Sequence, residues 1–175
     1  MREEEELSFK EDVQATFRLL VSKRMAFMIP QIIWSGVSIA YWSGLLSPIN
    51  ALSLRTMHPG IKEKKVLSES LYAMMFLGIG QAISGLIMGI IIDIFNSRRA
   101  CIANVFVMFL TFIISVVNLQ QLEYGWISYL TCFMWGLSDG CLNTHSYQML
   151  GFEFDSQNAP FAIYTLVQGV AVFGF

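Results

Sequence analysis

Three long stretches of this sequence contain no charged residue. No Asp, Glu, Lys or Arg occurs between Arg24 and Arg55, between Glu69 and Asp93, or between Arg99 and Glu123. Each stretch is rich in Ile, Leu, Val, Met and Phe. Each also exceeds the roughly 20 residues with which a helix crosses the hydrocarbon core of a bilayer. We therefore predict an all-α fold, a polytopic bundle of transmembrane helices that lies in a lipid bilayer.

The composition favours the same class and argues against several others. Hydrophobic residues make up 55% of the 175 residues and charged residues 14%, whereas about 25% is charged in a typical soluble domain. The net charge of -2, without a basic stripe, predicts no binding to nucleic acid. Cys101, Cys132 and Cys141 lack metal-ligand or redox spacing, so we expect small buried side chains. The sequence has no metal cluster, nucleophile triad or phosphate loop, so we expect no enzyme activity, no metal and no cofactor.

The chain divides into an amino-terminal tail, residues 1–24, and a transmembrane bundle, residues 25–175. In the tail, an acidic run precedes a predicted helix from Ser8 to Arg24, with Ser8 and Glu11 as a capping box. We expect this helix to lie in the membrane interface; the alternative is a tail that docks on nothing. The predicted spans cover about residues 25–46, 70–92, 100–119, 124–150 and 160–175, and the last span is cut short.

Prolines and polarity predict local features of the spans. Pro30 should kink the first span, and Pro48 should end it before a loop over residues 50–68. The third span is apolar nearly all round, so we expect it to face lipid at the periphery of the bundle.

Small residues in the second span recur on one helical face. Gly78, Ala82, Gly85 and Gly89 follow one another at spacings of four, three and four. Such a face lets a neighbouring helix approach closely in lipid, where no hydrophobic force drives helices together. The pattern predicts a packing face for another helix.

Basic residues give a weak indication of orientation. Five lie near the membrane on the side of the tail and four lie on the other side: Arg18, Lys23, Arg24, Arg98 and Arg99 against Arg55, Lys62, Lys64 and Lys65. Because basic residues are retained on the cytoplasmic side, we expect a multi-pass integral membrane protein with a cytoplasmic tail.

The segment after the second span combines Gly89, Asp93, Arg98 and Arg99. An acid at a helix end, near basic residues and the start of another helix, can make a contact that forms in one conformation and breaks in another. Alternatively, these charges simply mark the boundary with water. The segment resembles the loop motif of the major facilitator superfamily, Gly-x-x-x-Asp followed by Gly-Arg-Lys or Gly-Arg-Arg. That resemblance implies a conformational gate.

The fourth span carries an acid deep in the membrane. A charge at mid-membrane costs roughly 2.5–3.5 kcal/mol on insertion scales, so Asp139 must face protein or a water-filled cavity. Asn143 and then Ser146 or Tyr147 follow on its face at helical spacing, and His145 lies on a neighbouring face. These residues could line a solute or proton path, with Asp139 titrating and Asn143 orienting the ligand. The alternative is a buried network that holds helices together.

The string that runs from Trp135 to Gly151 is similar to a signature of the uncoordinated-93-like branch of the major facilitator superfamily. In that branch Trp-Gly-x-x-Asp leads to Asn-Thr-Gln and then to Leu-(Tyr or Phe)-Gly, and Trp135 thereby joins the candidate residues of the path. His145 stands where Gln is usual. The stretch 159–169 also resembles this branch, with Val167 in place of a Trp.

The resemblance covers about residues 25–175 and fits the carboxy-terminal half of the transporter. It implies a carrier of two six-helix halves with its site between them. Because four spans and part of a fifth cannot enclose such a path, we expect the missing helices of a longer chain or a partner membrane protein. Two functions stay open: alternating-access transport of a solute or ion, and a non-transporting subunit that regulates or escorts an ion channel or another membrane protein.

Overall fold

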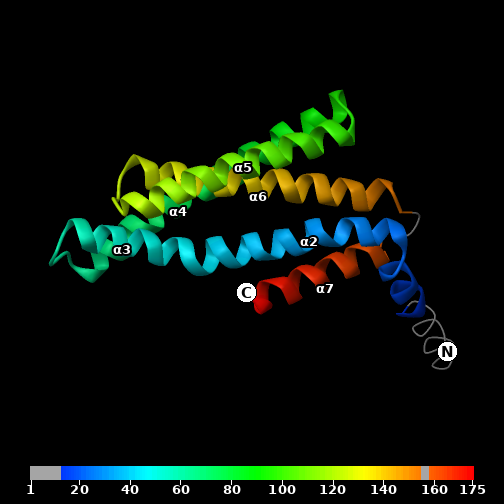
Figure 1. The fold of residues 1–175 in the computed structure, drawn as a ribbon, viewed down its shortest axis with the longest axis horizontal. Helices are drawn as coiled ribbons and strands as arrows, with labels where there is room; N and C mark the ends of the chain where they lie inside the picture. The colour runs from blue at the N-terminus through cyan, green and yellow to red at the C-terminus, as the bar shows by residue number, and fades with distance from the viewer. Residues whose placement is uncertain (1–12, 155–157) are drawn as a thin grey trace. The chain divides into compact units, whose positions relative to one another are not determined.

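The computed structural model describes residues 13–154 and 158–175, which are drawn as coloured ribbon in Figure 1. These residues form helices and no strand, which confirms the predicted all-α fold. A helical segment over residues 13–20 comes first. It is followed by α2 (Lys23–Tyr41), the π-helix η1 (Trp42–Leu46), α3 (Ser47–Met57), α4 (Glu63–Ile94), α5 (Ser97–Gln121), α6 (Trp126–Phe152) and α7 (Asn158–Gly174).

The described residues belong to two compact units. One contains the described residues up to Val37 together with those from Ser146 onwards, and the other contains Ser38–His145. Both α2 and α6 therefore contribute residues to each unit.

Within the part of the chain that the structure describes, three helices are long and apolar enough to cross a membrane. They are the continuous helix Lys23–Met57 of 35 residues, formed by α2, η1 and α3, and the helices α4 of 32 and α5 of 25 residues. The shorter α7 is also apolar. The 27-residue α6 carries the polar series around Asp139 and is not among the three. The predicted location in a lipid bilayer is confirmed by these helices.

The prediction that Pro48 ends the first span is wrong. Proline lacks the backbone N–H, and its ring crowds the carbonyl four residues earlier. The wider π-turn η1 comes directly before Pro48, so the helix adjusts locally and continues to Met57. The connection to α4 is accordingly short, residues 58–62, instead of 50–68.

The prediction that the third span lacks a polar face is also wrong. One side of α5 is buried and carries short polar side chains: Asn104, Thr111, Ser115 and Asn118. The hydroxyl of Thr111 donates to the carbonyls of Val107 at 2.9 Å and of Met134, in α6, at 3.1 Å. Such hydroxyls are satisfied within their own helix and still permit close contact with another. The opposite side exposes Phe106 and Phe109, as expected for contact with lipid.

The first unit has an apolar core to which the amino-terminal segment contributes. Its buried residues are Met25, Met28, Ile32, Leu150, Ile163 and Tyr164. Leu19 and Leu20 pack against this core, whereas Val13 and Phe17 are exposed. The described part of the segment therefore docks on α2, α6 and α7 while one apolar side stays open. The predicted cap at Ser8 and Glu11 lies outside the described residues.

In the second unit, η1, α4 and α6 together contribute a core of Leu46, Ala73, Leu77, Cys132 and Trp135. Cys132 and Cys141 are buried, as expected for small apolar side chains, but Cys101 is exposed at the first turns of α5.

Candidate functional site

The carboxylate of Asp139 lies inside the second unit, with 3% of the residue exposed. Gln81 Nε2 donates to its Oδ2 at 2.7 Å and Asn143 Nδ2 donates to the same oxygen at 3.1 Å. Ser38 Oγ donates to Oδ1 at 3.5 Å. Because these donors come from α4, α6 and α2, one side chain links three helices.

The surroundings of Asp139 consist of neutral donors. No described basic side chain forms an ion pair with it. The buried indole N–H of Trp42 has no hydrogen-bond partner among the described residues. An ionised carboxylate accepts only, which matches this donor set, and either amide can instead turn its oxygen toward a protonated carboxyl. The site is therefore able to hold Asp139 in both forms.

The remaining polar residues of α6 have other partners. His145 is buried, and its Nε2 lies 3.0 Å from the hydroxyl of Ser97 at the start of α5. Ser146 belongs to the first unit, where its hydroxyl accepts a 2.8 Å hydrogen bond from Gln31 Nε2. Of the predicted path residues, the structure thus brings together Asp139 and Asn143, and places His145 in a contact between α6 and α5.

Trp135 is a packing residue of the second unit. Its ring stacks on Tyr41 with centroids 4.4 Å apart, and it forms a T-shaped pair with Phe112 with centroids 6.0 Å apart. The indole Nε1 donates to Ser115 Oγ at 2.8 Å. Since the ring contacts α2 and α5 and only 3% of the residue is exposed, it packs α6 against these two helices, and a role of Trp135 in a path stays a prediction.

We expect Trp135 and Ser115 to be energetically coupled. Ser115→Ala should lower the free energy of unfolding by about 1–2 kcal/mol, because the buried indole N–H loses its acceptor. In a double-mutant cycle with Trp135→Phe, the coupling should be about 1 kcal/mol, measured by reversible unfolding in detergent. Additivity within about 0.3 kcal/mol would show that this hydrogen bond contributes nothing.

The loop residues predicted as a gate are all near the ends of α4 and α5. Asp93 is exposed in the last turn of α4, and Arg98 and Arg99 are exposed in the first turn of α5. The guanidinium of Arg99 lies over the ring of Phe95, 5.3 Å from its centroid. No described residue forms an ion pair with Asp93. The conformational gate, which also includes Gly89, stays a prediction.

The predicted face of small residues makes no close packing contact within the described chain. Gly78 and Ala82 are exposed. A Cβ added to Gly78 or Gly89 would meet nothing within 4 Å, and one added to Gly85 would lie 3.6 Å from Thr144 Oγ1. A packing role for this face stays a prediction that concerns a helix outside the described residues.

Close packing of α4 against α6 uses other small residues. A Cβ on Gly80 would collide with the carbonyl of Phe133, and one on Gly136 with the carbonyl of Leu77. A Cβ on Gly140 would collide with the side chain of Ser84. The backbones of α4 and α6 therefore touch along a line defined by these three glycines.

Sequence reasoning missed the partners of the acid and a second polar cluster. Gln81 is the one long polar side chain in the predicted span 70–92, and in lipid such a side chain needs a buried partner, so it carried a usable signal. In the first unit, Gln168 Nε2 donates to Ser35 Oγ at 2.8 Å and to Tyr164 Oη at 3.0 Å. The two hydroxyls are themselves 3.2 Å apart. This cluster joins α2 to α7.

Comparison with known proteins adds a family to this geometry. The sequence model described as ion channel regulatory protein UNC-93 matches residues 1–123, which include α2 to α5 and the loop at Asp93. The α6 signature that begins at Trp135 lies beyond the matched residues. No solved structure matches the chain. Because the match covers more than half of the sequence, this integral membrane protein belongs to the UNC-93 family.

Proposed function

We propose that the protein is a membrane-embedded regulatory subunit that associates with an ion channel or another membrane protein. The observation that carries this proposal is the match over residues 1–123 to a family described as ion channel regulatory. Association in the membrane requires helix faces that the subunit does not use itself, and α4 and α5 provide them.

The open face of α4 suits a partner helix. Large apolar side chains such as Leu71, Met75 and Leu86 are exposed along it, and Gly78 and Ala82 are exposed between them. Small residues let the backbone of a second helix come close, which strengthens dispersion contacts in lipid. The oxygens of Asp139, in contrast, are already engaged by side chains of the chain itself.

The proposal predicts that Gly78→Leu impairs a co-expressed channel without damage to the subunit. We expect at least a twofold loss of channel at the cell surface, measured by surface biotinylation, because the leucine blocks close approach of the partner helix. Gly44→Leu is the matched control, since Gly44 is exposed and also has open space around it. Equal channel levels with both variants would contradict the proposed interface.

A second candidate is alternating-access transport of a solute or ion by a major-facilitator fold, of which this chain would form the carboxy-terminal half. Asp139 favours it, because this buried acid has no basic partner among the described residues. In this proposal Asp139 and Asn143 line the path, Asp93 acts as the gate contact and the tail lies in the cytoplasm.

Asp139→Asn separates the two candidates in the protein expressed with its natural membrane partners. A proton-coupled carrier should lose uptake while still reaching its membrane, because an amide cannot titrate. A regulatory subunit should keep the surface level of its channel. Loss of the subunit itself from the membrane would instead identify Asp139 as a structural residue.

A further inference from the structure

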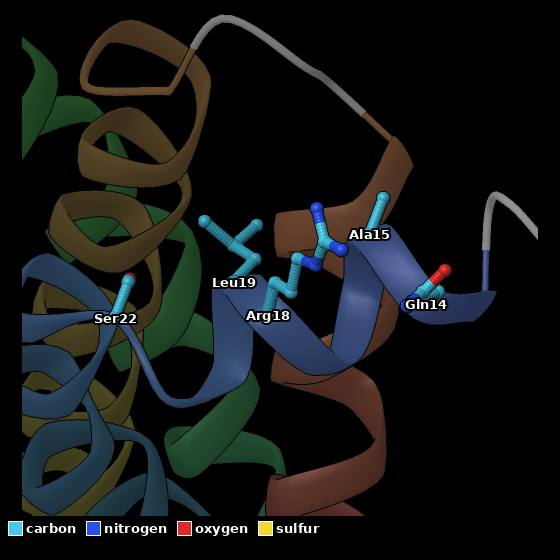
Figure 2. A pocket seen from close by; sticks show the side chains of 5 residues that line it. All are labelled: Gln14, Ala15, Arg18, Leu19 and Ser22. Carbon is cyan, nitrogen blue, oxygen red and sulfur yellow. The ribbon is translucent and has the colours of Figure 1, made fainter.

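The first unit contains an open groove where the amino-terminal segment meets the ends of α6 and α7. Two adjoining hollows of about 540 and 340 Å³ share Ala15, Leu19 and Ser22. The larger one is completed by Gln14 and Arg18, and the smaller one by Arg24, Glu153, Phe154 and Ala159. Figure 2 shows the larger hollow, with the side chain of Arg18 between Leu19 and Ala15. The lining thus combines guanidinium groups with apolar side chains.

Among the described residues, the charges around this groove are mainly positive. Residues 13–24 include Arg18, Lys23 and Arg24 and no acid. Arg24 Nη1 lies 3.5 Å from the backbone carbonyl of Glu153, which holds this guanidinium at the edge of the groove. Arg18 forms no ion pair with any described residue. In the lining given by the described residues, Glu153 contributes one carboxylate and Arg18 and Arg24 contribute two guanidinium groups, a balance that favours an anion.

Exposed apolar side chains beside these basic residues place the groove at the membrane surface. Phe17, Val21 and Phe27 are 64%, 81% and 86% exposed, and α2 enters the charge-free stretch directly after Arg24. A helix that combines basic residues with exposed aromatic and aliphatic ones lies in the interfacial plane of a bilayer. There, each arginine meets the negative potential of anionic lipids.

We propose that this groove binds an anionic phospholipid. Arg18 and Arg24 hold the phosphate oxygens, for which guanidinium groups are suited by charge and by paired N–H donors. Leu19, Phe154 and Ala159 contact the glycerol and the first part of the acyl chains. The apolar half of the lining is the reason to assign a lipid instead of a free phosphate ion.

The test uses the purified full chain in a neutral detergent, titrated with short-chain phosphatidylglycerol. Binding is followed by the rise of the unfolding temperature and by native mass spectrometry. The double variant R18Q/R24Q should bind about 25-fold more weakly, about fivefold for each arginine. The control K64Q/K65Q removes the same charge from exposed lysines in the first turn of α4 and should bind like the unaltered chain.

Three results would overturn the proposal. R18Q/R24Q could bind the lipid with the same affinity as K64Q/K65Q, which would show that any loss of affinity reflects net charge and not the position of Arg18 and Arg24. Phosphatidylcholine could bind as tightly as phosphatidylglycerol, which would remove the role of anionic charge. Glycerol phosphate without acyl chains could bind as tightly, which would indicate a site for a soluble anion.

A measurement on the unaltered chain keeps the test decisive even if a variant fails to fold. Its affinity for phosphatidylglycerol should fall as the salt concentration rises, while its affinity for phosphatidylcholine should stay weak, because salt screens exposed charges. A salt-independent affinity would contradict binding through Arg18 and Arg24. Neither result depends on whether the protein regulates a channel.

Discussion

Gly136→Leu is expected to prevent stable packing of α6 against α4. A Cβ at this position would overlap the carbonyl of Leu77, and backbone atoms cannot move aside as the end of a flexible side chain can. Because the two helices would have to separate along their contact, we expect a loss of about 3 kcal/mol or more in the free energy of unfolding. Thermal unfolding of the purified protein in detergent measures it, together with the monodisperse yield.

Gly78→Leu provides the matched control on α4. It adds the same side chain, but a Cβ there meets nothing within 4 Å, so its unfolding temperature should lie within about 2 °C of the unaltered protein. Gly85→Ala should also be tolerated, since the new methyl group would lie at ordinary contact distance from Thr144. A stable Gly136→Leu protein would show that α4 and α6 do not touch at this point.

Asp139→Ala is expected to destabilise the second unit by about 3 kcal/mol. The substitution leaves the amides of Gln81 and Asn143 and the hydroxyl of Ser38 without the acceptor that they share. Unsatisfied buried polar groups cost about 1–3 kcal/mol each. Removal of the carboxylate also removes the free-energy cost of burying it, which offsets part of the sum. Asp139→Asn should lose about 1–2 kcal/mol, because one acceptor oxygen remains.

Asp93→Ala is the control, because Asp93 is exposed and forms no ion pair with a described residue. Asp93→Ala should change the free energy of unfolding by less than about 0.5 kcal/mol. Reversible unfolding in mixed micelles compares the three variants. If Asp139→Ala were as stable as the unaltered protein, the network would not hold α2, α4 and α6 together, and a role of Asp139 in transport would gain support.

Predictions from the sequence succeeded where a residue has a very different free energy in lipid and in water. The three charge-free stretches correspond to the three described helices that can cross a membrane. A charged side chain is costly in hydrocarbon whatever the helix packs against, so such segments lack charge. Asp139 is buried, as its depth required. The end of the first span at Pro48 was predicted wrongly. A proline is easy to see in a sequence, whereas the π-turn that accommodates it here has no comparable sequence pattern.

The choice between helix faces was beyond the sequence. The predicted face on the second span contains Gly78 and Ala82, whereas the observed contact with α6 uses Gly80 and Ser84. Both sets recur at helical spacing, and nothing in their spacing separates them. Because lipid solvates an apolar face as well as protein does, hydrophobicity cannot show which side of such a helix is buried.

The sequence by itself therefore determined that this protein lies in a lipid bilayer, that it is helical and that Asp139 is buried. Each follows from the free energy of placing charge and backbone groups in hydrocarbon. Only the tertiary structure decided which donors surround that acid. Gln81 and Ser38 come from other helices, 58 and 101 residues away in the chain. Whether these donors reach the acid depends on how closely the helix backbones pack. Between α4 and α6 that distance is short because Gly80, Gly136 and Gly140 have no Cβ.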